Sequence, residues 1–491
     1  MARVATADAG AAVAAVPQAQ ASSFLSLAAF RMLLVYIVIL FVQPQNRFTF
    51  LWPLHIADLS FMGAVGLHIM ACVQDRRPII RFGPATIVSV LLLVFAMLSQ
   101  YIGEYQTSSE WNPYIDIIVK NATLCILLEA MLTSVQRVMA TQLVVLVSTL
   151  WWIKAGVRLA QAGATYGGDR LMGAAVGMIE NPNGFAYMMC VFLPVYLYMF
   201  QQARRAWERW VFLALMLAGV YIVFKTGSRT GLVTLMLLAV FILRRYGRQH
   251  LKGLLLIMLA IAVLFPLSGE RNIQRFKTIP QSVKGFLGLG GGKEREGPMN
   301  QDEQSADERA RKNEHTWGLI KEHLFFGVGV RPDESRFAAR WPMATGQVHC
   351  EILMAGKQMG MIGMGLYVAY WSILLVGGGL VRRRARGRDA VADLGWTFQL
   401  QGVCIMVGGS FCPGAWHPPL MILTASVSAL LANLANPDDV WVRDDSGGPG
   451  TLPPPSSPLP WARRAAPVRL PQKKAGDADG GSETVSPIGA K

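Results

Sequence analysis

Apolar stretches long enough to cross a lipid bilayer recur along most of this chain, and they constrain its fold more than any other feature. A transmembrane helix needs roughly 20 predominantly apolar residues to span the hydrocarbon core. Hydrophobic residues make up 53% of the sequence and charged residues only 16%, which is typical of a membrane protein and not of a soluble enzyme. We therefore predict an all-α polytopic membrane protein with about twelve transmembrane helices. The predicted spans are 26–43, 50–73, 86–103, 113–133, 139–155, 183–201, 208–226, 229–243, 252–267, 350–378, 394–411 and 419–435.

Basic residues cluster in every second loop between these spans. Short cytoplasmic loops carry the excess of Lys and Arg in membrane proteins, so the alternation places both termini in the cytoplasm. The clusters do not gather into one basic patch with interleaved aromatic residues, so the net charge of +15 reflects topology and excludes nucleic-acid binding. The clusters are Arg76, Arg77 and Arg81; Arg137; Arg204, Arg205 and Arg209; Arg244, Arg245, Arg248 and Lys252; and Arg382, Arg383, Arg384, Arg386 and Arg388.

The spans divide the chain into five segments. Residues 1–25 are a cytoplasmic N-terminal segment, 26–267 hold the first nine helices, and 350–435 hold the last three. Residues 436–491 are rich in Pro and Gly and predict a disordered cytoplasmic tail. The segment 268–349 is a large loop on the outer, periplasmic face, and its second half has the polarity of a helix. A loop of this length is uncommon in a compact protein unless it is functional, although a decorative insertion is the alternative.

One histidine stands where this large loop enters a span. In "VHCEILMAGKQMGMIG", residues 348–363, His349 directly precedes an apolar helical pattern. A histidine there can simply pack or cap at an interface. Its ring can also meet both water and a substrate at membrane depth, and the positive end of the following helix disfavours the protonated imidazole. Because a neutral imidazole can accept a proton, we interpret His349 as a candidate general base.

Arginines on the predicted outer face are the second group of candidates, because cations are few there and costly at membrane depth. Arg229 lies in "KTGSRTG" between two spans, where Ser228 and the glycines form a turn whose backbone N–H groups can face an anion; snorkelling to headgroups is the alternative. Arginine suits phosphate because its planar fork makes bidentate bonds without losing its proton. The sequence offers no obvious carboxylate cluster for Mg²⁺, so we predict an anion site that works without a metal. The other candidates are Arg309, Arg311, Arg331 and Arg170.

Several motifs, in order along the chain, resemble the O-antigen ligase and O-antigen polymerase superfamily of bacterial envelope proteins. The stretch from His349 to Gly363 has the spacing of that family's histidine motif, with Leu353 and Gly360 at the expected positions. The hexapeptide "GSRTGL" resembles the family's Ser-Arg-Thr-Gly element at the start of a span. The heptapeptide "HLFFGVG" resembles the element between the outer-loop helix and the histidine.

Two further motifs resemble one branch of that superfamily, the branch associated with exopolysaccharide and exosortase loci. They are "SADER", which ends at Arg309 and has Trp317 eight residues later, and the stretch at 170–186. The resemblance covers about 160–375. The departures from the family pattern are Cys350, where Asn or Ser is usual, Gln358, which replaces an acidic residue, and Leu324, which replaces Pro.

The resemblance implies a GT-C-like membrane glycosyltransferase in the bacterial inner membrane, with its active site on the periplasmic face. It would move a glycan from a polyprenyl diphosphate carrier to an acceptor hydroxyl, with inversion and without a cofactor. His349 would be the base, and Arg229 and Arg309 would stabilise the leaving diphosphate. The partners implied are the bilayer, the lipid-linked glycan, an acceptor glycan or glycolipid and other polysaccharide assembly proteins. The residues expected in diphosphate and substrate binding are Arg331, Arg170, Ser228 and Arg311.

Alternatives to this activity stay open at the level of sequence. The acceptor can be a lipid-linked repeat unit, as for a polymerase, or lipid A core, as for a ligase. It can also be a protein, as for a protein O-oligosaccharyltransferase. A different class is a non-enzymatic transporter or flippase of the same glycolipid, since arginines can line a passage for a diphosphate. The hydropathy pattern shows no two-half repeat, which favours the enzyme. The sugar, its linkage and the oligomeric state are not determined by the sequence.

Overall fold

The computed structural model describes residues 24–104, 113–166, 170–173, 180–246, 265–266, 270–277, 301–385, 388–412 and 416–435. Within these residues the chain is mostly helical, and nine segments are long and apolar enough to cross a membrane. These helices confirm the prediction of a multi-pass membrane protein. The count of twelve spans and the orientation of the chain stay predictions.

A helix lies at each predicted span that falls within the described residues. Two of them, α4 (Pro113–Met131) and α8 (Arg229–Tyr246), each contain three charged residues and so fall outside the apolar set. The predicted span 252–267 lies outside the described residues except for 265–266. The nine apolar segments are α1 (Phe24–Val42) with η1 (Pro44–Asn46), η2 (Thr49–Leu54) with α2 (Ile56–Gln74), α3 (Pro84–Ile102), α5 (Val135–Gln161), α6 (Pro182–Gln202), α7 (Ala206–Lys225), α14 (Glu351–Ser372) with η5 (Ile373–Gly377) and α15 (Gly378–Arg384), α16 (Asp389–Gly409), and α17 (Pro418–Ala435).

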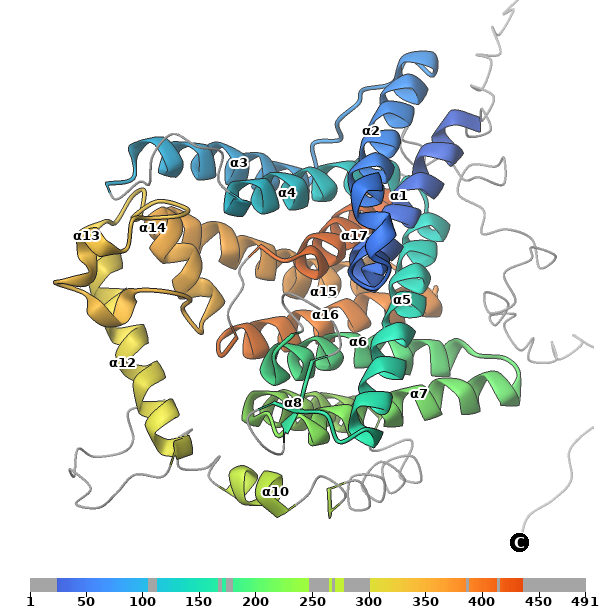
Figure 1. The fold of residues 1–491 in the computed structure, drawn as a ribbon. Helices are drawn as coiled ribbons and strands as arrows, with labels where there is room; N and C mark the ends of the chain where they lie inside the picture. The colour runs from blue at the N-terminus through green and yellow to red at the C-terminus, as the bar shows by residue number, and fades with distance from the viewer. Residues whose placement is uncertain are drawn as a thin grey trace, which may run out of the picture.

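The helices pack in layers around α6 and α17. In Figure 1, α3 and α4 lie above α14–α17, and α6, α7 and α8 lie below them. Helix α6 packs against α7, α16 and α8, and α17 packs against α4. Both α6 and α17 are buried on nearly all sides, as expected of helices that are apolar all round. They form the centre of the hydrophobic core, and the other helices surround them.

Helix starts follow the local sequence signals. Asn181 caps α6, because its side-chain oxygen accepts the N–H of Gly184 at 2.8 Å, and Pro182 occupies the first helical position. Asparagine and proline are favoured at these two positions. The "NPNG" stretch is therefore a helix start, as its turn-forming residues indicate.

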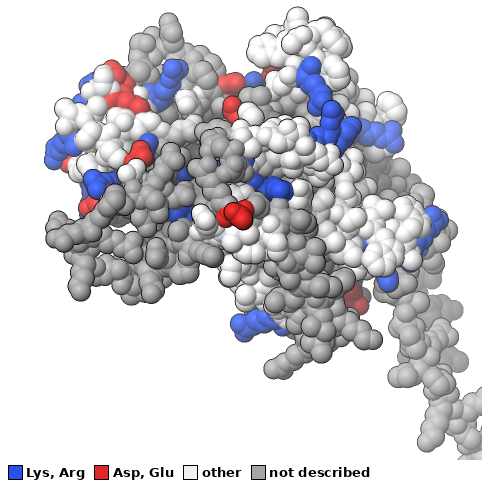
Figure 2. All heavy atoms as spheres, turned by 60° about the horizontal axis from the view of Figure 1, so that its bottom comes forward, with Lys and Arg blue, Asp and Glu red and all other residues white. Residues whose placement is uncertain are grey.

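The long loop predicted at 268–349 is partly helical, as expected. It contains α10 (Glu270–Lys277), α12 (Gln301–Glu322), the short α13 (Ser335–Ala338) and η4 (Pro342–Ala344). Figure 2 shows acidic and basic side chains intermingled at the left edge of the molecule, over α12 and α13, beside a broad uncharged surface. This part is therefore distinguished from the apolar bundle by its surface as well as by its sequence.

One small element departs from the all-α prediction. Strands β1 (Thr165–Tyr166) and β2 (Arg170–Leu171) pair antiparallel, with Thr165 opposite Leu171. Two-residue strands are too short for a hydropathy pattern to reveal them. The hairpin lies between α5 and α6 and carries one of the candidate arginines.

Candidate functional site

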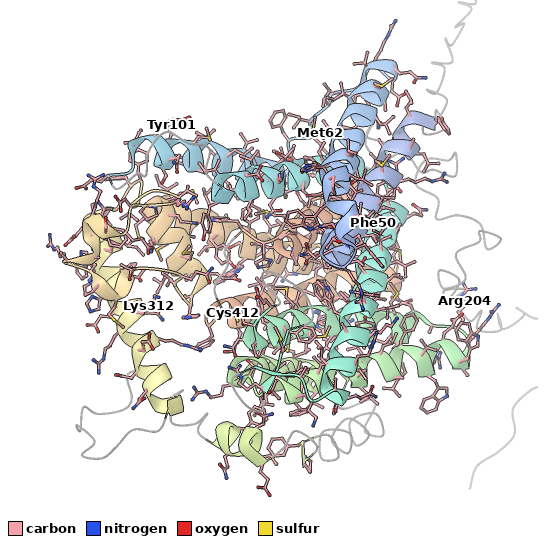
Figure 3. The ribbon with its side chains drawn as sticks, in the orientation of Figure 1. Phe50, Met62, Tyr101, Arg204, Lys312 and Cys412 are labelled. Atoms are coloured by element: carbon pink, nitrogen blue, oxygen red, sulfur yellow. The ribbon has the colours of Figure 1, made fainter. Side chains whose placement is uncertain are left out.

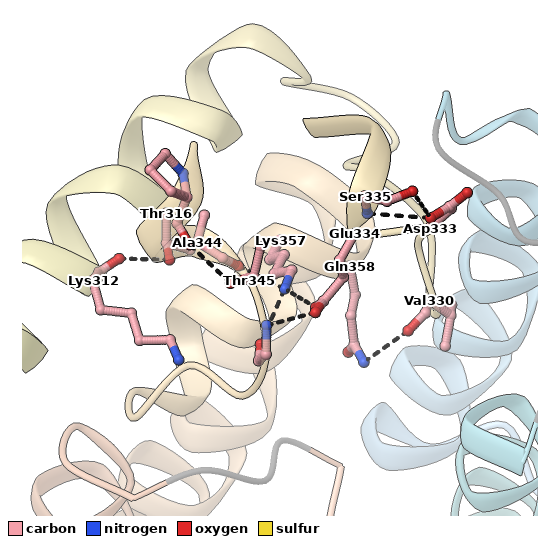
Figure 4. Close-up of polar contacts among 12 residues, drawn as sticks. Lys312, Thr316, Val330, Asp333, Glu334, Ser335, Ala344, Thr345, Lys357 and Gln358 are labelled. Atoms are coloured by element: carbon pink, nitrogen blue, oxygen red, sulfur yellow. Dashed lines mark hydrogen bonds and ion pairs between the residues drawn. The ribbon is translucent and has the colours of Figure 1, made fainter. Parts of the chain in front are cut away.

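The segment that carries His349 is held in place by a buried lysine in α14. Lys357 is 2% exposed, and its Nζ donates to Glu334 Oε1 at 2.9 Å, to the carbonyl of Ala344 at 2.8 Å and to that of Gly346 at 3.1 Å. Figure 4 shows these bonds joining α14 to the loop in front of it. Three donors meet three acceptors, so the charge is fully satisfied although it is buried. The loop just before His349 is thereby fixed against the helix that follows it.

The "HLFFGVG" element packs against α14 at a point where the helix is interrupted. Gly360 has φ +63°, and a Cβ there would lie 2.2 Å from the carbonyl oxygen of Leu324. The N–H of Met361 donates to that same carbonyl at 2.7 Å, and the N–H of Val328 donates to the carbonyl of Lys357 at 2.9 Å. Only glycine tolerates both this φ and this close approach. Gly360 therefore interrupts the helix where the loop packs against it.

His349 is half-buried in the loop directly before α14. Burial, the largest cause, and the nearby cations Arg309 and Lys312 together lower the pKa of its imidazole to about 4, while Glu308 acts in the opposite sense. The ring is therefore neutral at physiological pH and able to accept a proton. We expected a neutral ring from the helix terminus; the structure adds burial and two α12 cations as causes.

The two predicted arginines of α12, Arg309 and Arg311, differ in how exposed their side chains are. Arg309 is half-buried and acts electrostatically on His349 and on Cys412. Arg311 is exposed and forms an ion pair with Asp307 at 2.6 Å. The exposed pair offers little binding free energy to a substrate. Lys312, three residues after Arg309 and so on the same face of the helix, acts on His349 instead. Figure 3 labels it on α12. Sequence reasoning missed Lys312, although this spacing from Arg309 is a signal that could have found it.

A second group of predicted residues meets around Arg170. Its Nη2 donates to Asn183 Oδ1 at 2.7 Å, and its Nε donates to the carbonyl of Thr226 at 3.1 Å. Arg170 therefore joins the β hairpin, the start of α6 and the "KTGSRTG" turn. Three motifs that are separate in the sequence are adjacent in space.

Within that turn, Ser228 and Arg229 occupy different environments. Ser228 is 1% exposed, and its hydroxyl accepts the N–H of Gly231 at 3.1 Å at the start of α8. It acts as a helix cap, which accounts for it without a substrate. Arg229 is the first residue of α8 and is half-buried. Arg331 lies apart from this turn, exposed in the loop before α13.

A buried polar cluster beside His349 was not predicted. Glu351, the first residue of α14, is fully buried, and its Oε1 lies 3.5 Å from Nε2 of His417, which is 5% exposed. The Tyr187 hydroxyl lies 3.3 Å from the same Nε2. Nδ1 of His417 accepts the N–H of Leu420 at 3.2 Å, so in the neutral ring the proton is on Nε2 and faces the carboxylate and the phenol.

Two glycines at the end of α16 make room for this cluster. A Cβ at Gly409 would lie 2.5 Å from Oε2 of Glu351, and a Cβ at Gly408 would lie 2.1 Å from the ring of Tyr187. Cys412, which follows α16, has its thiol pKa raised by burial and by Glu351, whereas Arg309 lowers it. The Cys412 thiol is therefore subject to the charges of both Glu351 and Arg309.

The geometry defines a multi-pass membrane protein in which a neutral histidine stands beside helix α12 cations at the start of a broken apolar helix. Residues 214–368 match a family model described as O-antigen ligase, and residues 23–204 match a family of unknown function. No curated protein matches the chain. The match over residues 214–368 supports the resemblance to the O-antigen ligase and polymerase superfamily of membrane proteins. Most of the residues discussed above lie within or directly beside the matched segments.

Proposed function

We propose that the protein is a membrane glycosyltransferase of cell-surface polysaccharide assembly, making exopolysaccharide or O-antigen. It transfers a glycan from a polyprenyl diphosphate carrier to an acceptor hydroxyl, on the periplasmic face of the inner membrane, with both termini in the cytoplasm. The observation that carries this proposal is the neutral, half-buried His349 beside Arg309 and Lys312, within a segment matched by the O-antigen ligase family.

In this reaction His349 accepts the proton of the acceptor hydroxyl. The hydroxyl oxygen bonds to the anomeric carbon as the bond from that carbon to the carrier's phosphate oxygen breaks, and the diphosphate leaves with the bonding electrons. Displacement from the opposite side inverts the anomeric centre. A positioned base typically contributes about 10²- to 10⁴-fold in rate.

Cations stabilise the charge that develops on the leaving diphosphate. Arg309 and Lys312 stand beside His349 and can meet the diphosphate on the side of α12. Arg229, the first residue of α8, is the further cation that we assign to the diphosphate, and Arg170 holds the turn before it. Fixed cations at a partly dry site stabilise such a charge more than water does. Arg331 lies on the surface, where it can contact the glycan, and the same role suits Arg311.

The test is a transfer assay with purified full-length protein in lipid nanodiscs. A lipid-linked glycan and an acceptor are supplied, and the polyprenyl diphosphate released is measured. We expect release by the wild type and its loss in His349→Ala. The control is His55→Ala, at an exposed histidine. Activity that survives chelation by EDTA would support the metal-independent step, and full activity of His349→Ala would contradict the role of this base.

The same assay separates the alternative classes. A transporter of the glycolipid releases no polyprenyl diphosphate, whereas every transferase does. Glycolipids and surface polysaccharide extracted from a deletion strain then separate the acceptors. Accumulated single lipid-linked repeats indicate a polymerase, unattached long chains indicate a ligase, and loss of glycan from protein indicates a protein O-oligosaccharyltransferase.

A further inference from the structure

A basic cavity lies on α5, apart from the residues assigned to transfer. It has a volume of about 290 Å³ and is lined by Arg47, Trp151, Lys154 and Arg158, together with small and apolar residues of α5. The Arg47 guanidinium lies 4.7 Å from the centre of the Trp151 ring, and Nζ of Lys154 lies 5.4 Å from it. The lining includes no carboxylate, so three cations converge without a neutralising charge.

Ordinary structural roles explain these cations one at a time but not together. Arg158 is in the last turn of α5, where a cation complements the helix dipole, and a cation over an indole ring is attracted to the face of that ring. Among the described residues, none of the three forms an ion pair with Asp or Glu. Three like charges around one cavity repel each other, and an anion in the cavity removes that repulsion.

The segment beside the cavity has the character of a membrane surface. Phe48, Phe50 and Trp52 directly follow Arg47 in the chain, and each is at least half exposed. Figure 3 labels Phe50 in this segment. Aromatic side chains concentrate where the hydrocarbon core meets the headgroups. A ligand here meets cations at one end and exposed apolar rings at the other, which is the pattern of a lipid and not of free phosphate.

We propose that this cavity binds the phosphate head of a membrane lipid. The phosphate lies among Arg47, Lys154 and Arg158, and the lipid's apolar part lies along Phe48 and Phe50. Arginine forks make charge-assisted bonds to phosphate oxygens, and the ammonium of Lys154 adds a point charge.

The cavity lies at the end of α5 that leads to the candidate site. Arg158 is six residues before Ala164, whose carbonyl accepts the N–H of Met172 at 3.4 Å. That bond continues the hairpin of Arg170, which joins the "KTGSRTG" turn. A lipid bound here therefore lies on the same side of the bundle as Arg229. Two lipids carry the required chemistry: a phospholipid, or a polyprenyl diphosphate held apart from the transfer site.

Native mass spectrometry of the full-length protein in detergent tests this, with bound lipids counted per molecule. We expect phosphatidylglycerol to bind and diacylglycerol, which lacks phosphate, not to bind. The variant Arg47→Gln/Lys154→Gln/Arg158→Gln should bind phosphatidylglycerol at least about tenfold more weakly, because three charge-assisted contacts are lost. The control Arg31→Gln/Arg382→Gln/Arg383→Gln, at three exposed cations outside the cavity, should bind as the wild type does.

The same binding measurement, repeated with polyprenyl diphosphate, identifies which lipid the cavity holds. If the maximum number of bound carrier lipids falls from two to one in the triple variant, the cavity holds a second carrier. If only phosphatidylglycerol binding falls, the cavity holds a phospholipid. Equal binding by the triple variant and the wild type, binding of diacylglycerol, or full displacement by inorganic pyrophosphate at the same concentration would overturn the proposal. The readout is binding, so failure leaves the proposed transfer reaction untouched.

A second measurement needs no variant. Lys154 and Lys321 are both exposed and both lie over a Trp ring, at 5.4 and 5.8 Å, but only Lys154 lines the cavity. Acetylation of the wild-type protein should be slowed by phosphatidylglycerol at least about fivefold at Lys154, since a bound phosphate covers its amine, and unchanged at Lys321. Equal rates at both lysines, with and without the lipid, would overturn the proposal.

Discussion

Two histidines stand directly before apolar helices in this molecule, and their surroundings are opposite in charge. His349 precedes α14 and is half-buried beside Arg309 and Lys312. His417 precedes α17 and is buried against the carboxylate of Glu351. The local sequences look alike, because each pairs a histidine with the start of a hydrophobic helix.

The difference shows that a helix start alone does not assign a role to a histidine. Cations around His349 oppose a proton on its ring, so the ring stays neutral and can accept one during a reaction. A carboxylate beside His417 favours a proton on Nε2, and burial leaves no room there for a glycan. We therefore assign proton transfer to His349 and a positioning role to His417.

The largest effect that tests this comparison is on the rate of transfer. His349→Ala should lower kcat by about 10²- to 10⁴-fold, because the acceptor hydroxyl loses its base, and should leave thermal unfolding in detergent nearly unchanged. His417→Ala should mainly lower the unfolding temperature. The assay is release of polyprenyl diphosphate, normalised to folded protein. Comparable activity in both variants at equal folded concentration would remove the distinction between the two histidines.

The next effect is on stability at the second histidine. Glu351→Ala should destabilise the protein by about 3 kcal/mol, because it removes the buried carboxylate that lies 3.5 Å from Nε2 of His417. Glu351→Gln should cost less, about 1 kcal/mol, since the amide keeps a polar oxygen beside Nε2 of His417. Glu314→Ala, at an exposed acid of α12, is the matched control. Denaturation measured for all three in the same detergent should give this order, and equal stability of Glu351→Ala and Glu314→Ala would contradict it.

How much of the fold and of the candidate site could be predicted from sequence depends on how far apart in the chain the interacting residues are. The spans follow from hydropathy, which is a local property, and His349 is recognisable from its motif. In the sequence, Glu351 looks like an ordinary polar residue at the start of a helix. Only the packing of α14 against the segment after α16 shows that it faces His417. Lys357 likewise reads as a misplaced charge in an apolar helix, because its three acceptors belong to a loop that folds back onto it. Interactions between distant segments are therefore what the sequence left undetermined.

A smaller effect is expected in the pH dependence of transfer. The pKa of His349 is about 4, so kcat/KM should fall only as the pH drops toward 4. Arg309→Gln/Lys312→Gln should move this acid limb upward by about one unit at most, because burial, the larger cause, remains. Arg311→Gln, at the exposed cation paired with Asp307, is the control. A limb that does not move, or that moves downward, would show that the α12 cations do not act on the base.

Protonation of His349 also changes the free energy of unfolding, and the direction of this change follows from the pKa. An unfolded histidine has a pKa near 6.5, above the value of about 4 in the folded protein. Between these values the unfolded chain binds more protons, so the free energy of unfolding rises with pH there. The contribution of His349 is complete above about pH 6.5 and is lost as the pH falls through 4. In His349→Asn this part of the pH dependence should vanish.

The smallest effect concerns the residue after each histidine. Pro418 starts α17, whereas Cys350 caps α14 without a side-chain hydrogen bond. Burial raises the pKa of the Cys350 thiol, so it stays protonated and is a poor nucleophile. Cys350→Ser should therefore keep transfer within about threefold of the wild type, and its hydroxyl can cap the helix, which changes stability by at most about 1 kcal/mol. A loss above tenfold in the release assay, with unfolding unchanged, would mean that the thiol contacts the acceptor.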